Sequence, residues 1–195
     1  MNKQLMAVAI AAAAALAAPA HATTVALAAD GSWSGFDVDN TIAADFGNGW
    51  IDNTDGSALN FTFTVGAGQV GTLTVVDTVF AGDTFTITNF GGALGTTSSV
   101  AIGTTDGAIE YDFAAALANP AYSHGVFSLQ AGTYSISGAL LQSVQYPAGG
   151  DVDATSGGVS LTVAAVPEPS GLALMLGGFA AVALLARRRR SVHSI

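Results

Sequence analysis

The stretch Leu59-Asn60-Phe61-Thr62-Phe63-Thr64-Val65 decides the fold class, because apolar and polar residues alternate along it without a break. Side chains that alternate in this way lie on opposite faces of a pleated strand, one facing a core and the other facing water. The same alternation recurs at residues 85–88 and 134–137. We therefore predict an all-β domain.

Other short apolar or β-branched runs surround these three segments, and Gly, Asn and Asp residues separate them. The additional predicted strands are 33–38, 73–76, 109–113, 126–129 and 159–163. Only residues 114–118 predict a helix, and it is short. Many short strands joined by turns favour an antiparallel β-sandwich with a jelly-roll-like arrangement. The last strand is expected at a sheet edge, leading directly into the segment that follows.

The N-terminus has the order of parts typical of a secretory signal peptide. Lys3 precedes an apolar run at 5–18, and Ala20-His21-Ala22 follows with small residues at its first and third positions. We predict that residues 1–22 are a signal peptide cleaved after Ala22. The alternative is an Ala-rich buried helix.

The C-terminus has three parts: Pro167-Glu168-Pro169, an apolar stretch at 171–186, and the cluster Arg187, Arg188, Arg189 and Arg190. The two prolines keep the first part extended. At about 1.5 Å per residue the apolar helix reaches roughly 24 Å, slightly less than a hydrocarbon core of about 30 Å. Because arginines resist translocation, we predict a single transmembrane helix with a cytoplasmic tail at 191–195.

The order of these three parts resembles the PEP-CTERM sorting domain, over residues 167–190. The resemblance implies export, a transient inner-membrane anchor, and recognition by a membrane-embedded exosortase in a Gram-negative bacterium that makes exopolysaccharide. The partners implied are that exosortase and the Sec and signal-peptidase machinery. Processing would then deliver residues 23–166 to the cell surface or extracellular matrix. The alternative is a plain C-terminal membrane anchor.

Segments within 23–166 are also similar to ectodomains found before PEP-CTERM tails, at 71–77, 80–85, 94–98 and 127–134. One such group is named for a Phe-x-Asp-x-Phe pattern. Here Phe80, Asp83 and Phe85 have a spacing that is one residue longer. This resemblance implies no active site.

Charge in the domain at 23–166 has one sign, because it holds every acidic residue except Glu168 and contains no Lys or Arg. Such a surface repels phosphate backbones, so we predict no nucleic-acid partner. The chain has no cysteine, which excludes disulfides and thiolate chemistry. Stability must come from apolar burial and hydrogen bonds, and a bound cation would relieve self-repulsion.

Aspartates gather between residues 30 and 55, and calcium is bound by oxygen-rich loops of this kind. The candidate calcium ligands are Asp37, Asp39, Asp52 and Asp55. An EF-hand template starting at Asp52 fails, because its twelfth position is Phe63. The alternative is ordinary Asx-turn and Asp-Gly turn chemistry, and no other cofactor is expected.

Trp33 and Trp50 flank this acidic region, and aromatic faces beside carboxylates suit a sugar ring. They are the candidate sugar-binding residues, with core packing as the alternative.

No catalytic constellation stands out in the sequence. His124 is the one histidine of the domain and is expected in a loop. Gly66, Gly68 and Gly71 have the spacing of the dinucleotide-binding fingerprint, but a β-branched run follows them where that fingerprint requires a helix. They therefore predict a hairpin connection. We therefore predict a non-enzymatic structural or interaction module associated with exopolysaccharide or biofilm. The alternative is a carbohydrate- or calcium-binding module, and a more distant one is a glycan-active hydrolase using a carboxylate pair.

Overall fold

The alternating segment forms strand β3 (Leu59–Val65), and its apolar residues are buried while the polar residues between them are partly or fully exposed. The computed structural model describes residues 22–42 and 47–166 together with Met175 and Phe179. The described elements are β1 (Thr23–Ala26), β2 (Asp30–Asp39), β3, β4 (Gln69–Asp77), β5 (Val79–Phe80), β6 (Thr84–Asn89), β7 (Gly92–Thr96), β8 (Ile109–Glu110), α2 (Phe113–Ala118), β9 (His124–Leu129), β10 (Gly132–Gln142) and β11 (Ala154–Ala165). The all-β prediction is confirmed.

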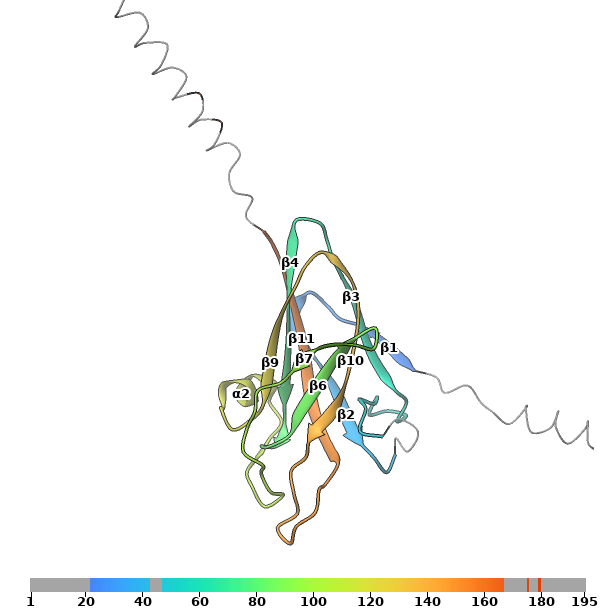
Figure 1. Cartoon of the computed structure of the whole chain (residues 1–195), viewed down its shortest axis with the longest axis vertical. Coiled ribbons are helices and arrows are strands. Elements are labelled where there is room, and N and C mark those ends of the chain that lie inside the picture. The colour runs from blue at the N-terminus through green and yellow to red at the C-terminus, as the bar shows by residue number, and fades with distance from the viewer. Residues whose placement is uncertain (1–21, 43–46, 167–174, 176–178, 180–195) are drawn as a thin grey trace, which may run out of the picture.

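Two large sheets carry the fold, one with the strand order β1-β3-β10-β6-β7 and one with the order β2-β11-β4-β9 (Figure 1). Apart from β1, each sheet has four antiparallel strands, and most connections pass from one sheet to the other. This is the connectivity of a jelly roll. Strand β1 departs from it, because β1 adds to β3 in parallel. A third, two-stranded sheet pairs β5 with β8.

The core lies between the inner faces of the two large sheets. Phe36 of β2 meets Phe85 of β6 edge to face across this gap, with ring centroids 5.2 Å apart. Trp50 stacks on Phe36 at 4.0 Å, and Phe61 of β3 contacts Trp50 edge-on. These aromatic residues form one cluster with buried aliphatic residues of both sheets. Because the chain has no disulfide to hold it, burial of this cluster is the main source of stability.

Three sequence expectations are corrected by the strand pairing. The predicted strand at 109–113 is reduced to β8, because Asp112 caps α2 by accepting a hydrogen bond from the Ala115 backbone N–H. The glycines at 66–71 do not close a hairpin, because β3 and β4 belong to different sheets. Strand β11 is not an edge strand, because it pairs with β2 on one side and β4 on the other.

Both predicted targeting segments fall on residues that the structure does not describe. These are residues 1–21 of the signal peptide, Pro167, Glu168 and Pro169, most of the predicted span at 171–186, the arginine cluster, and the tail at 191–195. Among the described residues, no helix is both long enough and apolar enough to span a bilayer.

A tight loop joins β4 to β6 and lies at the end of the sandwich near α2 (Figure 1). Val79 in this loop has a φ of 68°, which is unfavourable for a β-branched residue. At Gly82 the φ is 132°, and a Cβ there would lie 2.3 Å from the Gly103 backbone nitrogen, so no other residue fits. This closely packed loop begins at Asp77 and ends at Asp83.

Candidate functional site

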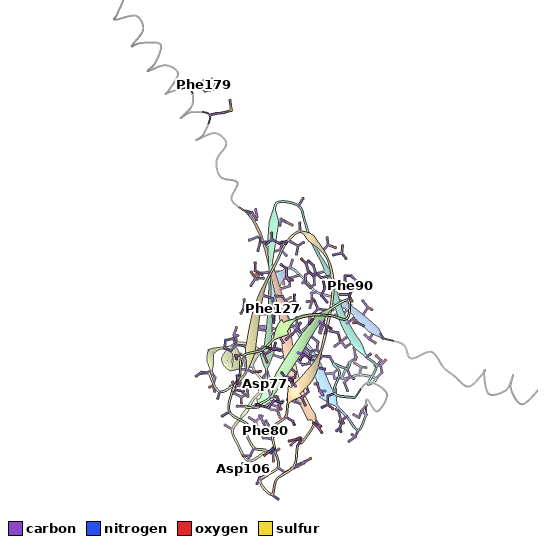
Figure 2. All side chains as sticks on the ribbon, in the orientation of Figure 1. Asp77, Phe80, Phe90, Asp106, Phe127 and Phe179 are labelled. Carbon is purple, nitrogen blue, oxygen red and sulfur yellow. The ribbon has the colours of Figure 1, made fainter. Side chains whose placement is uncertain are left out.

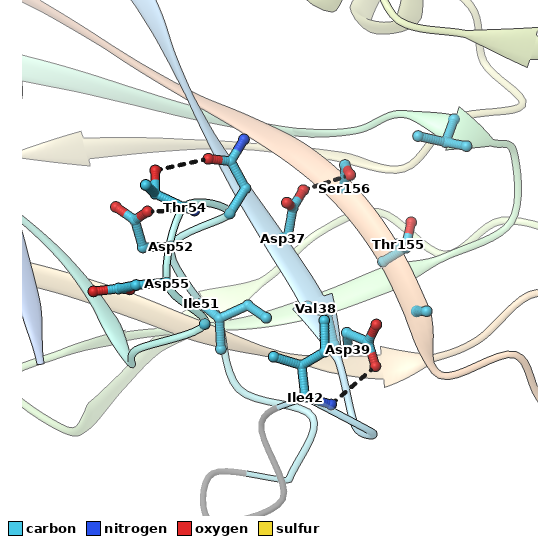
Figure 3. Close-up of a pocket in the computed structure, with 14 residues that line it drawn as sticks. Asp37, Val38, Asp39, Ile42, Ile51, Asp52, Thr54, Asp55, Thr155 and Ser156 are labelled. Carbon is cyan, nitrogen blue, oxygen red and sulfur yellow. Dashed lines mark hydrogen bonds between the residues drawn. The ribbon is translucent and has the colours of Figure 1, made fainter. Parts of the chain in front are cut away.

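The four aspartates predicted as calcium ligands line one groove of about 490 Å³ (Figure 3). Asp37 and Asp39 lie on β2, whereas Asp52 and Asp55 lie in the loop that leads into β3. Ile42 adds an exposed apolar side chain to the same groove. The volume falls within the range of small-ligand sites. The sequence therefore identified a set of residues that the fold does bring to one surface.

Each of these carboxylates accepts at least one hydrogen bond, and for Asp39, Asp52 and Asp55 the donors lie two or three residues later in the chain. Asp39 accepts hydrogen bonds from the Thr41 hydroxyl and the backbone N–H groups of Thr41 and Ile42. Asp52 and Asp55 each accept one from a backbone N–H two residues later, and Asp37 accepts one from the Ser156 hydroxyl at 2.5 Å. These are Asx-turn contacts, apart from the bond to Ser156.

The groove does not bring these four carboxylates together as a metal site. Within the described part of the chain, no three Asp, Glu, His or Cys side chains gather closely enough to hold a metal ion. Hydrogen bonds to Thr41 lower the pKa of Asp39, and those to Ser57 lower the pKa of Asp55. Such shifts show that local donors already stabilise the ionised carboxylates.

The two tryptophans do not form a sugar platform together. Trp50 is 1% exposed and stacks on Phe36, so neither of its faces can meet a sugar, and that part of the prediction is wrong. Trp33 is half-buried on β2 and stacks on Phe113 of α2 at 5.4 Å. The packing alternative holds for Trp50, because the indole fills the space between the two sheets.

His124 is not a loop residue, since it opens strand β9 and pairs with Val76 of β4. Its Nδ1 atom is buried and has no hydrogen-bond partner. The signal-peptidase residue Ala20 and the sorting residues lie outside the described residues, while Ala22 is described and exposed immediately before β1.

The sequence did not single out a second acidic site, formed by the buried residues Asp77 and Asp83. Asp77 is 0% exposed and Asp83 is 1% exposed. Neither carboxylate oxygen of Asp77 has a hydrogen-bond partner, and the same is true of Asp83 Oδ2. Asp83 Oδ1 accepts one hydrogen bond, from the Val144 backbone N–H at 2.7 Å. Buried polar groups in proteins are nearly always paired, so this cluster needs an explanation.

Burial and mutual repulsion shift the acidity of both groups. Desolvation, followed by the charge of Asp83, raises the pKa of Asp77 to about 9. Desolvation also raises the pKa of Asp83 to about 6, and the charge of Asp153 adds to this shift. The Tyr122 hydroxyl has a raised pKa as well, because it is desolvated and lies near the charge of Asp77. Two carboxyls held together away from water resist ionisation unless a positive charge joins them.

Thr155 of β11 is a third buried side chain near Asp83. Its hydroxyl lies near Asp83 and lowers the pKa of that carboxyl, although the contact falls outside hydrogen-bond geometry and leaves Thr155 Oγ1 without a partner. Thr155 and Val79 also line the acidic groove. The groove therefore reaches the wall of the buried cluster, whose place in the fold is marked by the Asp77 label in Figure 2.

Two sequence signals pointed to this cluster without revealing its burial. Asp77 directly follows the run 73–76, where an acid at the end of a buried strand is unusual. Asp83 is the acid of the Phe-x-x-Asp-x-Phe motif. Nothing in the local pattern indicated that these two residues meet Thr155, which lies more than seventy positions later.

Comparisons with known proteins give little further information. The chain matches no protein-family model and no curated protein. Among solved structures it is similar to the pre-peptidase C-terminal domain of a collagenase from Bacillus anthracis, with 11% identity and a TM-score of 0.37. That similarity covers 74% of this chain and 98% of the other. At this level it supports no argument about fold or function.

Proposed function

We propose that this chain is an exported protein of a Gram-negative cell envelope whose residues 23–166 act as a non-enzymatic structural or interaction module at the cell surface or in the exopolysaccharide matrix. Export would use the signal peptide at 1–22 and the Sec machinery. Sorting would use Pro167, Glu168 and Pro169, the predicted membrane span and the arginine cluster, with an exosortase as the processing partner.

One observation carries the proposal: the β-sandwich begins directly after the predicted signal-peptidase cleavage site and ends directly before the predicted sorting segment. Strand β1 starts at Thr23, the residue after the predicted cleavage site, and the Thr23 backbone N–H donates to Ala58 O at 2.7 Å. Strand β11 ends at Ala165, and the Val166 N–H donates to Gly68 O at 2.8 Å. Cleavage at either side would therefore leave every strand intact.

The pairing of β11 supports a displayed module. The strand that leads toward the sorting segment is hydrogen-bonded on both sides, to β2 and to β4. A tether attached to a central strand transmits force into a paired ladder, whereas a tether attached to an edge strand can be peeled away one pair at a time. This placement suits a domain held at a surface by its C-terminal end.

The positions of the acidic groups favour a non-enzymatic role over glycoside hydrolysis. A hydrolase needs an accessible carboxyl with a raised pKa that can act as a general acid. The raised pKa values belong to Asp77 and Asp83, which a sugar cannot reach because both are buried. In the accessible groove, Asp39 and Asp55 have lowered pKa values.

The test is to replace Pro167, Glu168 and Pro169 together with alanine in the producing bacterium. Labelling of intact cells with an antibody and mass spectrometry of the recovered protein would report display and processing. We expect the parent protein to begin at Thr23 and to reach the surface, and the variant to remain in the membrane fraction. A matched control replaces residues 191–193 with alanine and should be displayed normally. Display of the motif variant at the parent level would overturn the proposal.

A second candidate function is glycan binding in the acidic groove. The groove places the exposed side chain of Ile42 beside several carboxylates, which could meet the apolar face and the hydroxyls of a sugar respectively. Calorimetric titration of exopolysaccharide fragments into the parent protein and an Ile42→Asp variant tests it. Equal binding by the two proteins would place any glycan elsewhere.

A further inference from the structure

We infer that Asp77, Asp83 and the Thr155 hydroxyl form a buried binding site for one calcium ion at the end of the β-sandwich. This site is distinct from the acidic groove and goes beyond the proposed sorting and display, on which it does not depend. Its ligands come from three parts of the chain: the end of β4, the loop before β6, and β11.

The first argument comes from oxygens that have no partner. Asp77 Oδ1 and Oδ2, Asp83 Oδ2 and Thr155 Oγ1 are all buried, and none has a hydrogen-bond partner. Burying such a group unpaired costs about 1–3 kcal/mol, and more when the group is charged. Within the part of the chain that the structure describes, all four unpartnered oxygens of buried side chains thus belong to these three residues. A single cation would satisfy them together.

The second argument excludes protonation as a sufficient remedy. A neutral carboxylic acid still carries an O–H donor and a C=O acceptor, and both need partners when buried. Neither Asp77 oxygen has a hydrogen-bond partner, and the nearby backbone N–H groups of Thr78, Gly82 and Asp83 favour the ionised form and cannot accept a hydrogen bond from a protonated carboxyl. A proton on Asp77 would therefore remove the charge without satisfying the group.

The third argument is charge balance. Residues 22–166 contain no Lys or Arg, so no such side chain in the domain can pair with the two buried acids. The charge of Asp153, close enough to act on Asp83, makes the surroundings more negative still. A divalent cation would neutralise the two carboxylates that lie within the cluster.

The chemistry of the donors favours calcium among divalent cations. All the side-chain donors are oxygens, which suit Ca²⁺ and Mg²⁺ and not the softer metals that prefer nitrogen or sulfur. Magnesium keeps several of its waters, whereas calcium accepts carboxylate, hydroxyl and backbone carbonyl oxygens in irregular shells. Because both acids are 0–1% exposed, an ion bound between them would be shielded from bulk solvent and would have to lose most of its waters, which calcium does more readily than magnesium. Backbone carbonyls and waters would complete its coordination.

The loop geometry agrees with a site of fixed shape. Asp83 is held by the Val144 N–H, and the Gln142 side-chain amide donates to Gly82 O at 2.6 Å. Asp83 and the neighbouring Gly82 are thus fixed by Gln142 at the end of β10 and by Val144, which follows it. Thr155 and Val79 line the acidic groove and neither acid does, so an ion that entered from this groove would have to pass these two residues.

The test measures calcium binding by the protein purified from cells and stripped with EDTA. Thermal unfolding with and without CaCl₂, and equilibrium dialysis with radioactive calcium, would be compared for the parent, Asp77→Asn, Asp83→Asn and Asp52→Asn. We expect one bound ion per chain and a rise in Tm of about 5–10 °C at a hundredfold excess over Kd. Both effects should be lost in the first two variants and retained in Asp52→Asn, which alters only the groove.

Three further results decide the assignment. If Asp77→Asn fails to fold, Thr155→Val removes one ligand and should weaken binding at least tenfold without altering the acids. Absence of bound calcium in the parent, or unchanged binding in the Asp77, Asp83 and Thr155 variants, would overturn the site. An equal rise in Tm with MgCl₂ would overturn the choice of calcium. These outcomes are independent of surface display, so the site and the proposed function can fail separately.

Discussion

Asp83 Oδ1 accepts a hydrogen bond from the Val144 backbone N–H at 2.7 Å, across 61 positions of sequence. This bond fixes the loop before β6 to the segment after β10. Because it uses only one carboxylate oxygen, the second oxygen is held in the interior beside Asp77 with no partner of its own. The charge state of this pair should therefore affect the stability of the whole domain.

Without calcium, the domain should become less stable as the pH rises from about 4 to 9. The folded pKa is about 9 for Asp77 and about 6 for Asp83, both above the ordinary aspartate value of 3.8. Over this range the folded state holds protons that the unfolded state has released, so stability falls with pH. Between pH 6 and 9 we expect a loss of roughly 1 kcal/mol per pH unit, mainly from Asp77. Urea unfolding in EDTA at several pH values measures it.

The control for this pH dependence is Asp77→Asn, which removes the proton that the folded state holds. In EDTA its stability should vary much less above pH 6 than that of the parent protein. The lowered pKa values of Asp30, Asp39 and Asp55 act in the opposite direction, but only as the pH falls below about 4. A parent protein whose stability is constant or increases between pH 6 and 9 would contradict the assignment of a buried, proton-holding Asp77.

The sequence predicted the fold well because the main signals are local. Alternation at Leu59–Val65 required nothing beyond the period of a strand, and β3 has those bounds. The short strand predicted at 109–113 failed because a capping contact from Asp112 outweighs the β propensity of Phe113. The hairpin at Gly66–Gly71 failed because local turn chemistry does not specify which sheet the next strand joins.

The candidate sites were predicted less well, because burial depends on long-range pairing. The aspartates of the groove were found from composition, yet Asp39, Asp52 and Asp55 each use one carboxylate oxygen in a local turn. Asp77 and Asp83 could not be recognised as a pair with Thr155 without knowing that β11 lies beside β4. For Trp50 the sequence left both sugar binding and core packing open, and the bridge between Gly49 and Ala139 places it in the core.

Calcium should stabilise the protein more at high pH than at low pH. Calcium binds ionised carboxylates, so at pH 5 it must displace protons from Asp77 and Asp83, whose folded pKa values are about 9 and 6. We expect a large rise in Tm on adding CaCl₂ at pH 8.5 and little or none at pH 5. Asp52→Asn serves as the control and should behave like the parent. A larger rise at pH 5 would show that calcium acts elsewhere.

Gly138→Ala should destabilise the core. A Cβ at this position of β10 would lie 2.5 Å from Trp50 Cε2 and 2.6 Å from the Thr86 carbonyl oxygen, so either the indole or the strand must move. Overpacking of this kind costs about 1–3 kcal/mol. The matched control is Gly92→Ala in β7, where the nearest atom would be Asn89 O at 3.4 Å, and its effect should stay within about 0.5 kcal/mol. Similar urea midpoints for the two variants would contradict the packing of Trp50 against β10.

Removing the C-terminal end of β11 should destabilise the domain, whereas removing everything after Val166 should not. Residues 162–165 pair with β4, the Val166 N–H bonds to Gly68 O, and Val163 packs against the core. At roughly 0.5–1.5 kcal/mol per hydrogen bond, a protein of residues 23–161 should lose at least about 2 kcal/mol relative to one of residues 23–166. Urea unfolding of both, beside the protein recovered from cells, makes the comparison. Equal stability of the two truncated proteins would mean that the pairing of residues 162–166 does not contribute to the stability of the domain. The domain would then tolerate a sorting cleavage inside β11.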